Sequence, residues 1–426
     1  MRACPVPLLG LLAAACLPTS TSAGERTVPA EPGALVHAIE TAEPGDILRL
    51  APGLHGGPVE IDKPLTLDGG GAATVRGTGT GSVIRVTGPD VVLRGLYVTG
   101  SGPSLKTIDA GISVLKGALR TRVEGNRIVN NLVGVDVHGG RDVTISGNAI
   151  VGRRDLRQSE RGPGVYVWQA PGLTVEENLI RSGRDGLFIN TSSKAVYRNN
   201  RFEELRFAVH SMNADDIEVS GNVSVGNDLG YALMYSKRLV LKDNRSIRDR
   251  SHGILLNYAN DSTVTGNLVL DGRDKCLFMY NANKNRVLGN RFEGCAIGIH
   301  FTAGSDRNVI AGNAFVGNRT QVKYVGTKWH EWSDKGRGNY WSDNAAFDLD
   351  GDGLADSPYR PNDVVDQILW SQPSARLLIG SPAVQLIRWS QSRFPGLLPG
   401  GVIDSHPLMK PVEIAPDPAK GPKEGS

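Results

Sequence analysis

The chain has 426 residues, of which 53 are glycine, only 6% are aromatic and 21% are charged, and its formal net charge is +3. So small a charge, without a basic stripe along the sequence, argues against nucleic acid as a partner. The length is sufficient for one large elongated domain with an appendage.

Residues 1–23 have the pattern of an export signal. Arg2 precedes an apolar run from Val6 to Leu17, and Thr21-Ser22-Ala23 offers small residues for cleavage. The run is too short to span a membrane, so we expect the mature protein to be periplasmic. The alternative is lipidation at Cys16, which would attach the mature chain to the membrane.

A short helix is predicted at the start of the mature chain. Leu35, Ile39 and Ala42 lie on one helical face, and Pro44-Gly45 ends the pattern. Short β-rich runs follow at residues 47–50 and 64–67. Because the first coil of a stacked structure needs cover, we expect this helix to cap the N-terminal end.

An asparagine recurs along the middle of the chain at intervals of 22, 30, 22, 22, 22, 23, 23 and 23 residues. A fixed period in this range indicates a solenoid. The eight extra residues in the interval of 30 lie within 153–163, which is polar and typical of a surface loop. The repeated residues are Asn126, Asn148, Asn178, Asn200, Asn222, Asn244, Asn267, Asn290 and Asn313.

Each period contains three short β-rich runs and no helical pattern of useful length. We therefore predict an all-β fold, a right-handed parallel β-helix of 22–23-residue coils within residues 24–320. The asparagine fits a corner between two strands, where it tolerates the left-handed conformation and where stacked amides can hydrogen-bond from coil to coil. The repeat therefore indicates fold rather than chemistry.

Cys276 and Cys295 are the internal cysteines. They occupy different phases of the repeat, 14 residues before and 5 residues after Asn290. Stacking between them is therefore poor, and we expect no disulfide.

The first strand of each coil alternates aliphatic residues with a second, unusual set. This second set should face outward, yet it is rich in aromatic residues, Met and His. A contiguous apolar stripe of this kind favours a binding surface, and cover by a loop is the alternative. The candidate partner-binding residues on it are Tyr166, Trp168, Phe188, Phe278 and Tyr280.

Within the stripe, His210 and Met212 point the same way on one strand, and Met234 follows Met212 by one 22-residue coil. Two thioethers and one imidazole form a soft ligand set that suits Cu(I). We predict a weak copper-transfer site here, with ordinary side-chain packing as the alternative.

Residues 321–410 differ in character and are predicted to be a partly helical docking extension. Asp348, Asp350, Asp352 and Asp356 resemble a calcium loop, but its twelfth position is Tyr359 instead of Glu. A weak calcium site and a structural turn both remain open. Ser381-Pro382 predicts a helix start, and the candidate docking residues after it are Ile387, Trp389 and Phe394. The tail, 411–426, is predicted to be disordered.

Several of these phrases resemble the NosD family, periplasmic accessory proteins for the maturation of nitrous oxide reductase. The specific ones are Gly-Asn-Tyr-Trp-Ser-Asp at 338–343, Asp-Gly-Asp-Gly at 350–353, Ser-Pro-Ala at 381–383 and Asp-Ser-His-Pro-Leu-Met at 404–409. The resemblance covers nearly the whole mature chain. It implies work with an ABC-type permease and ATPase, with the reductase and a copper chaperone as further partners, and a copper or sulfur cargo for the copper–sulfide centre. It implies no enzymatic activity.

The rival hypothesis is a β-helix lyase, hydrolase or epimerase acting on an acidic polysaccharide. Ser251-His252-Gly253 and Arg273-Asp274-Lys275 resemble pectinase phrases, with His252 one coil before Lys275. Hydrolysis, however, needs carboxylates converging on one face. The equivalent positions one and two coils earlier are Leu229 and Phe207, which disfavours this hypothesis.

Overall fold

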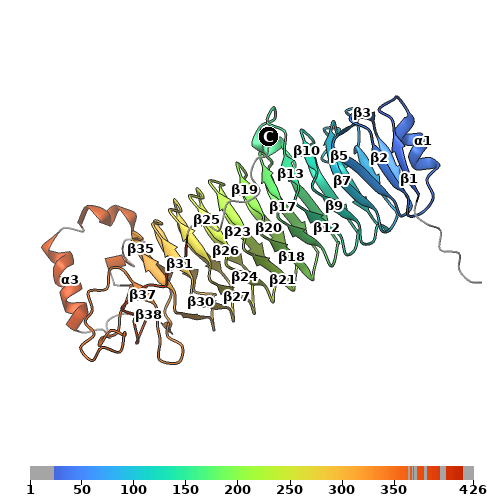
Figure 1. Ribbon diagram of the computed structural model, residues 1–426. Helices are drawn as coiled ribbons and strands as arrows, with labels where there is room; N and C mark the ends of the chain where they lie inside the picture. The colour runs from blue at the N-terminus through green and yellow to red at the C-terminus, as the bar shows by residue number, and fades with distance from the viewer. Residues whose placement is uncertain are drawn as a thin grey trace, which may run out of the picture.

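The structure is a computed structural model that describes residues 24–362, 365, 366, 368, 372–378, 381–393 and 400–415. It shows a right-handed parallel β-helix, as predicted, with a small helix at one end and a partly helical extension at the other (Figure 1). The predicted export signal, Phe394 and residues 416–426 lie outside the described residues. No helix in the described part of the chain has the length and apolar character needed to cross a bilayer.

One face of the solenoid is a twelve-stranded parallel sheet, called here the long-strand face. Each coil adds one strand to it, and every strand pairs with the equivalent strand one coil away. Its strands are β4 (Val59–Ile61), β6 (Ile84–Val86), β8 (Ala110–Leu115), β11 (Val133–His138), β14 (Val165–Trp168), β17 (Asp185–Asn190), β20 (Phe207–Met212), β23 (Leu229–Met234), β26 (His252–Asn257), β29 (Lys275–Tyr280), β32 (Ile297–Thr302) and β35 (Thr320–Val325).

The other two faces meet at the asparagine corner and form one 24-stranded sheet. Before the corner stand β1 (Glu25–Val28), β2 (Ile47–Leu50), β9 (Arg122–Glu124), β12 (Thr144–Ser146), β15 (Thr174–Glu176), β18 (Ala195–Arg198), β21 (Ile217–Ser220), β24 (Val240–Lys242), β27 (Thr263–Thr265), β30 (Arg286–Leu288) and β33 (Val309–Ala311). After it stand β3 (Gly53–Gly56), β10 (Arg127–Val129), β13 (Ala149–Val151), β16 (Leu179–Arg181), β19 (Arg201–Glu203), β22 (Val223–Val225), β25 (Arg245–Ile247), β28 (Leu268–Leu270), β31 (Arg291–Glu293), β34 (Ala314–Val316) and β37 (Tyr340–Trp341), while β5 (Thr66–Arg76) and β7 (Val92–Thr99) run through the corner.

The core is the stack of inward side chains from these three faces. Val135 and Val137 on β11 are fully buried, as are Leu187 and Ile189 on β17. Because every coil repeats the alternation, the inward aliphatic residues of successive coils touch and form one continuous core. The predicted alternation along the first strand of each coil is therefore confirmed.

The repeated asparagines form a buried hydrogen-bonded ladder. In the middle of the stack, the backbone N–H and the side-chain amide of Asn222 both donate to Oδ1 of Asn244, at 3.1 and 3.0 Å. The same amide donates to the Tyr197 carbonyl at 2.7 Å. These contacts satisfy backbone groups that a sharp corner would otherwise leave unpaired inside the protein. The predicted coil-to-coil bonding is confirmed.

The left-handed residue of the corner is not the asparagine. It is the residue before it, which is most often glycine, such as Gly147 with φ +64° or Gly266 with φ +65°. Asp243 takes the same conformation before Asn244. Our expectation was wrong on this point, because the asparagine is conserved along the stack for its inward amide, while the backbone reversal falls one position earlier.

The solenoid extends further than predicted. Asn339, 26 residues after Asn313, is a tenth rung of the ladder and accepts its hydrogen bonds at Oδ1. β35 and β37 also continue the sheets beyond residue 320. Residues 338–341 therefore belong to the solenoid rather than to the extension. The longer interval conceals this rung from a search for a fixed period.

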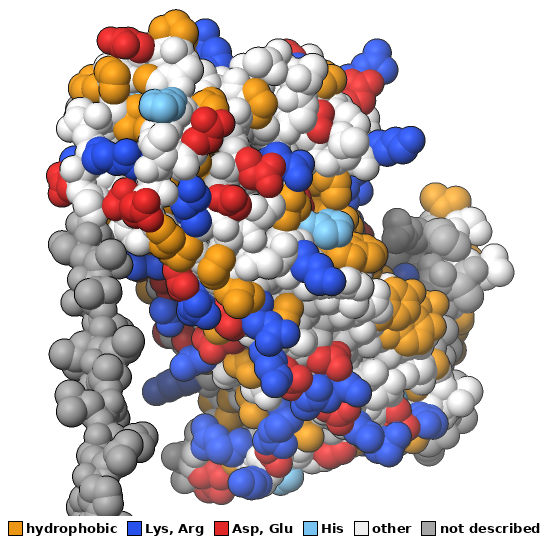
Figure 2. Space-filling view, turned by 90° about the vertical axis from the view of Figure 1, so that its right-hand side faces the viewer, with side chains coloured by type: hydrophobic (Ala, Val, Ile, Leu, Met, Phe, Trp, Pro, Cys, Tyr) orange, Lys and Arg blue, Asp and Glu red, His pale blue; other side chains and the backbone are white. Residues whose placement is uncertain are grey.

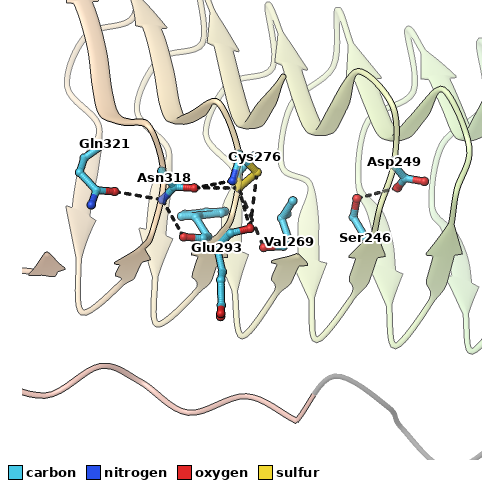
Figure 3. The surroundings of a disulfide bond; sticks show 9 residues. Ser246, Asp249, Val269, Cys276, Glu293, Asn318 and Gln321 are labelled. Carbon is cyan, nitrogen blue, oxygen red and sulfur yellow. Dashed lines mark hydrogen bonds between the residues drawn. A yellow bond between two sulfur atoms is a disulfide. The ribbon is translucent and has the colours of Figure 1, made fainter. Parts of the chain in front are cut away.

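Cys276 and Cys295 form a disulfide, with their Cα atoms 5.7 Å apart (Figure 3). The prediction of free cysteines is wrong, because it considered only stacking between equal phases of the repeat. Cys276 opens one coil, and Cys295 lies at the corner that closes the same coil 19 residues later. The chain has by then nearly completed a turn, so the two inward side chains meet across the corner.

Both ends of the stack are covered. At the N-terminus, helix α1 (Ala34–Glu40) buries Leu35 and Ile39 against the first strands, as predicted, and Ala42 is buried just beyond it. Figure 2 looks onto this end and shows positive and negative side chains intermixed, in keeping with the near-balanced charge. At the other end, β36 (Trp329–Glu331) pairs with β38 (Gly401–Ile403), and Trp341 stacks on Phe315 with ring centroids 4.5 Å apart.

Between these two strands, the extension contains the 3-10 helix η2 (Pro373–Leu378) and α3 (Pro382–Arg393). The predicted start of α3 is confirmed, because the Val384 N–H donates to Ser381 Oγ at 3.4 Å. Figure 1 shows α3 beyond the last coils, clear of the stack. The prediction of disorder from residue 411 is wrong for 411–415. There the Ala415 carbonyl accepts from Arg245 at 2.9 Å, and Glu413 pairs with Arg291 at 3.2 Å.

Candidate functional site

The outward side chains of the long-strand face form two neighbouring columns. One column runs through Tyr166, Phe188, His210, Ala232, Leu255, Phe278 and His300. The other runs through Trp168, Asn190, Met212, Met234, Asn257 and Tyr280. These two columns are called here the stripe.

The stripe is partly open to solvent. Tyr166, Trp168, Phe188 and Phe278 are half-buried against their column neighbours, and Tyr280 is 41% exposed. Tyr166 stacks on Phe188 with centroids 5.5 Å apart. The eight-residue insertion contacts the turns that follow β16 and β19 in the next two coils. Its Arg154 reaches Ser182 at 2.9 Å and Glu204 at 3.1 Å.

The structure places Met212 and Met234 in register on the adjacent strands β20 and β23. Both side chains are half-buried on the outward side. His210 stands two residues before Met212 on the same strand and therefore on the same face. All three predicted copper ligands thus lie within two neighbouring coils, and the backbones of the two methionines are one inter-strand spacing apart.

His210 is held more tightly than the sequence suggested. Its side chain lies between the rings of Phe188 and Phe207, which meet the imidazole edge-on at centroid distances of 5.0 and 4.8 Å. The residue is 8% exposed, and its Nδ1 lies 3.5 Å from Oδ2 of Asp185. The imidazole therefore has a defined orientation on the stripe.

Asp185 is itself fixed by arginines. Arg206 binds both carboxylate oxygens, at 2.8 and 2.6 Å, and Arg184 lies 3.7 Å away. Burial alone would raise the pKa of this fully buried carboxyl, but the contacts with His210 and Arg206 outweigh burial and hold the pKa below its usual range. At neutral pH the group beside His210 is therefore an anion.

Sequence reasoning missed Asp185 and Arg206. The signal was available, because the column that contains Asp185 continues with Phe207, Leu229 and His252 in successive coils. An acid in an otherwise mostly apolar column needs a partner, and Arg206 stands next to its neighbour in register.

A second outward cluster surrounds His252. It pairs in register with Lys275, as expected, and Asp274 lies 3.7 Å from His252 and 2.6 Å from Lys275. Phe278 packs between His252 and His300. Burial lowers the pKa of both histidines, and that of His300 falls to about 4, with Lys323 and Lys275 adding to the effect.

Two further tyrosines enlarge the apolar surface beside the methionines. Tyr235 directly follows Met234, is 54% exposed and stacks on Tyr258 with centroids 5.2 Å apart. Both backbones are left-handed, with φ of 50° and 51°, which is unfavourable for a bulky residue. The sequence interpretation missed them because they fall just outside the alternating strand.

The remaining candidates lie in the C-terminal extension. Asp348, Asp350 and Asp352 bring carboxylate oxygens within 4.8 Å of one another, and Asp356 instead accepts from the Leu349 N–H at 2.9 Å. Asp348 also accepts from the N–H groups of Gly351 and Gly353, at 2.7 and 2.9 Å, as in an ordinary turn. On α3, Ile387 is 36% and Trp389 57% exposed.

A profile of the family described as "Periplasmic copper-binding protein (NosD)" matches residues 146–346. A protein of Stutzerimonas stutzeri named "Probable ABC transporter binding protein NosD" is 41% identical over 376 residues, which cover 85% of this chain and 86% of that protein. This chain belongs to the NosD family.

A second NosD relative, from Pseudomonas aeruginosa, carries the same name and is 40% identical over 382 residues, which cover 87% of this chain and 89% of that protein. The matched segment of this chain, residues 146–346, includes His210, Met212 and Met234. Among solved structures, the A-module of the mannuronan C-5 epimerase AlgE6 from Azotobacter vinelandii has a TM-score of 0.54 at 16% identity, over 70% of this chain and 91% of that one. A likeness at so low an identity shows only that this NosD family member has a β-helix fold.

Proposed function

We propose that this protein is an exported, periplasmic accessory protein that receives and passes on copper during maturation of the copper–sulfide centre of nitrous oxide reductase. It acts as a binding protein rather than an enzyme, together with an ABC-type permease and ATPase. The observation that carries the proposal is the pair Met212–Met234, in register beside the oriented imidazole of His210. A copper chaperone is the expected donor and the reductase the expected acceptor.

The donor set fits Cu(I) as cargo. Thioether sulfur and neutral imidazole are soft, uncharged ligands, and three of them suffice for weak coordination of Cu(I). The two methionine side chains are half-buried on an outward face, which leaves room for a donor or acceptor protein to approach them. Weak binding suits transfer, because the cargo has to leave again.

The family description supports this proposal. The matching family is described as periplasmic and copper-binding, and the relatives are named as binding proteins of an ABC transporter. A disulfide between Cys276 and Cys295 fits an oxidising compartment. Sulfur, or the reductase itself, remains an alternative cargo for the same stripe.

The test is a Cu(I) titration of the purified mature protein against a competing chelator. Replacing Met212 and Met234 by Leu keeps volume and apolarity, so the fold should persist. We expect at least a tenfold weaker Cu(I) affinity in this double variant. The matched control is Met409→Leu, in the C-terminal cap. Equal affinity in the double variant and the wild type would exclude the methionine pair as ligands.

The acidic loop is a separate proposal, a weak calcium site built from Asp348, Asp350 and Asp352. Calorimetric titration with Ca²⁺, compared with Asp350→Asn, decides between a cation site and a structural turn. Absence of binding heat in the wild type would leave only the turn.

The polysaccharide-modifying enzyme remains the alternative function, because His252, Lys275 and Asp274 form a compact polar cluster on the same face. The register places Leu229 and Phe207 where further acids would be needed. Incubation with alginate and pectate, followed by assays for reducing ends, unsaturated products and epimerised residues, tests it directly. Turnover that disappears in His252→Ala would favour the enzyme.

A further inference from the structure

We infer that Asp185, pinned by Arg206, is a positioning residue for the metal site: it fixes Nδ1 of His210 as the protonated nitrogen and so presents Nε2 to the metal beside Met212. The inference rests on the proposed copper function and specifies how that site is organised. It concerns two residues that contact no expected cargo atom themselves.

The position of Asp185 defines which nitrogen it contacts. Oδ2 of Asp185 lies 3.5 Å from Nδ1 of His210. Asp185 pairs in register with Phe207, which stands three residues before His210 on β20. Nδ1 therefore faces the Phe207 side of the strand. The other ring nitrogen, Nε2, is then the one available to a metal held by Met212, which lies two residues along on the same face of the strand.

The carboxylate cannot easily turn away. Arg206 holds both of its oxygens, and the guanidinium of Arg206 lies over the Phe207 ring at 4.5 Å. Asp185 is fully buried, and His210 is enclosed by two aromatic rings. Within the part of the chain that the structure describes, no other carboxylate is recorded beside the His210 ring.

The chemistry of a histidine ligand requires such a partner. An imidazole that binds a metal through one nitrogen keeps a proton on the other, and a neighbouring carboxylate selects that tautomer and orients the ring. Loss of this kind of outer partner typically weakens metal affinity by about 10–100-fold. Asp185 and Arg206 therefore lie behind the proposed ligand His210 and orient it, without contacting the metal themselves.

The readout is the tautomer of His210 and its metal affinity, measured on the mature protein. In ¹⁵N-labelled protein, with the His210 signals assigned from His210→Gln, we expect protonated Nδ1 and bare Nε2. Addition of Cu(I), or of Ag(I) as a redox-inert probe, should shift the Nε2 signal. Asp185→Asn should mix the tautomers and weaken Cu(I) binding by about 10–100-fold.

The matched control is Asp249→Asn. Asp249 is also fully buried, but its partners are Ser224, Ser246 and the Asn227 N–H. It should leave the His210 tautomer and the copper affinity unchanged. If Asp185→Asn fails to fold, as circular dichroism would show, Arg206→Gln keeps the carboxylate and removes its clamp, and the same two readouts apply.

The outcomes separate this inference from the function on which it rests. A wild-type tautomer protonated at Nε2 overturns it. So does unchanged copper affinity in Asp185→Asn when the Met212→Leu/Met234→Leu variant binds more weakly. Unchanged affinity in the methionine variant removes the copper site, and the inference falls with it. The inference is supported if Asp185→Asn mixes the tautomers and weakens copper binding while Asp249→Asn changes neither.

Discussion

Oδ2 of Asp404 accepts a hydrogen bond of 2.7 Å from the backbone N–H of Asn339, where the next asparagine of the ladder would stand. The same oxygen accepts from Nε1 of Trp341 at 2.8 Å. Each rung of the ladder donates to the next, so the last rung needs an acceptor from outside the repeat. A residue 65 positions later in the chain supplies it. The C-terminal phrase at 404–409 therefore terminates the solenoid.

The first prediction concerns this cap. Asp404→Leu leaves the Asn339 and Trp341 donors buried without an acceptor, and we expect the free energy of unfolding to fall by about 2–4 kcal/mol. Asp404→Asn retains an acceptor oxygen and should cost less. Urea unfolding measures both, with the exposed Asp261→Asn as control. Equal stability of Asp404→Leu and wild type would contradict the capping role.

The second prediction concerns the disulfide. Cys276 and Cys295 close a loop of 19 residues, and the double Ser variant should lose about 3 kcal/mol of unfolding free energy. Wild-type protein that is unfolded in the presence of a reductant should show a similar loss of unfolding free energy. Thiol titration of the denatured, unreduced mature protein is the direct check. Two reactive thiols would show that the cysteines are free.

The third prediction is a pH dependence that arises at Asp136. Burial raises the pKa of this carboxyl to about 7, although the Ser113 hydroxyl donates to it at 3.0 Å. The unfolded chain releases this proton near its ordinary value of 3.8, while the folded protein retains it to about pH 7. The contribution of Asp136 to the free energy of unfolding is therefore most favourable below pH 3.8, declines as the pH rises to about 7, and stays unfavourable above that pH.

Asp136→Asn removes this titration. Relative to wild type, the variant should gain on the order of 2–4 kcal/mol of unfolding free energy between pH 4 and pH 8. Chemical denaturation at both pH values measures the change, and the exposed Asp261→Asn is the control. A difference between variant and wild type that does not vary with pH would contradict the raised pKa.

The fourth prediction concerns docking to the membrane complex. Leu386 and Trp389 on α3 are 63% and 57% exposed, which suits an apolar helix face laid into a partner's groove. Leu386→Ser/Trp389→Ala should leave the solenoid folded, as circular dichroism would show, and abolish co-purification with the permease and ATPase. Leu54→Ser, exposed at the opposite end, is the control. Retained co-purification in the α3 variant would place the docking surface elsewhere.

Deletion of residues 362–410 would be a less specific test of docking. Val402 and Asp404 are buried in the C-terminal cap, and β38 pairs with β36. Such a deletion would remove the acceptor of the last ladder rung and expose Trp341. Loss of binding would then report damage to the solenoid rather than loss of a docking helix. Replacing only residues 372–399 by a flexible linker keeps β38 and Asp404 and so avoids this damage.

The sequence by itself determined the solenoid, its period and the faces of its strands. The repeat can be recognised locally, because each coil has the same alternation of inward and outward residues. Stacking such similar coils leaves little freedom in strand register. The same regularity predicts that Met212 and Met234 are neighbours on adjacent coils, and their register agrees. The resemblance of the C-terminal phrases to the NosD family is also recognisable from the sequence, because each phrase is a contiguous run of residues.

Only the tertiary structure decided the contacts between residues at different phases of the repeat. The disulfide joins the opening of one coil to its closing corner, Asp185 reaches His210 diagonally across two coils, and Asp404 returns from the extension to end the ladder. Periodicity predicts neighbours of equal phase. Contacts between unequal phases depend on how the corners bend, how side chains turn and where the chain returns, and these are set by packing in three dimensions.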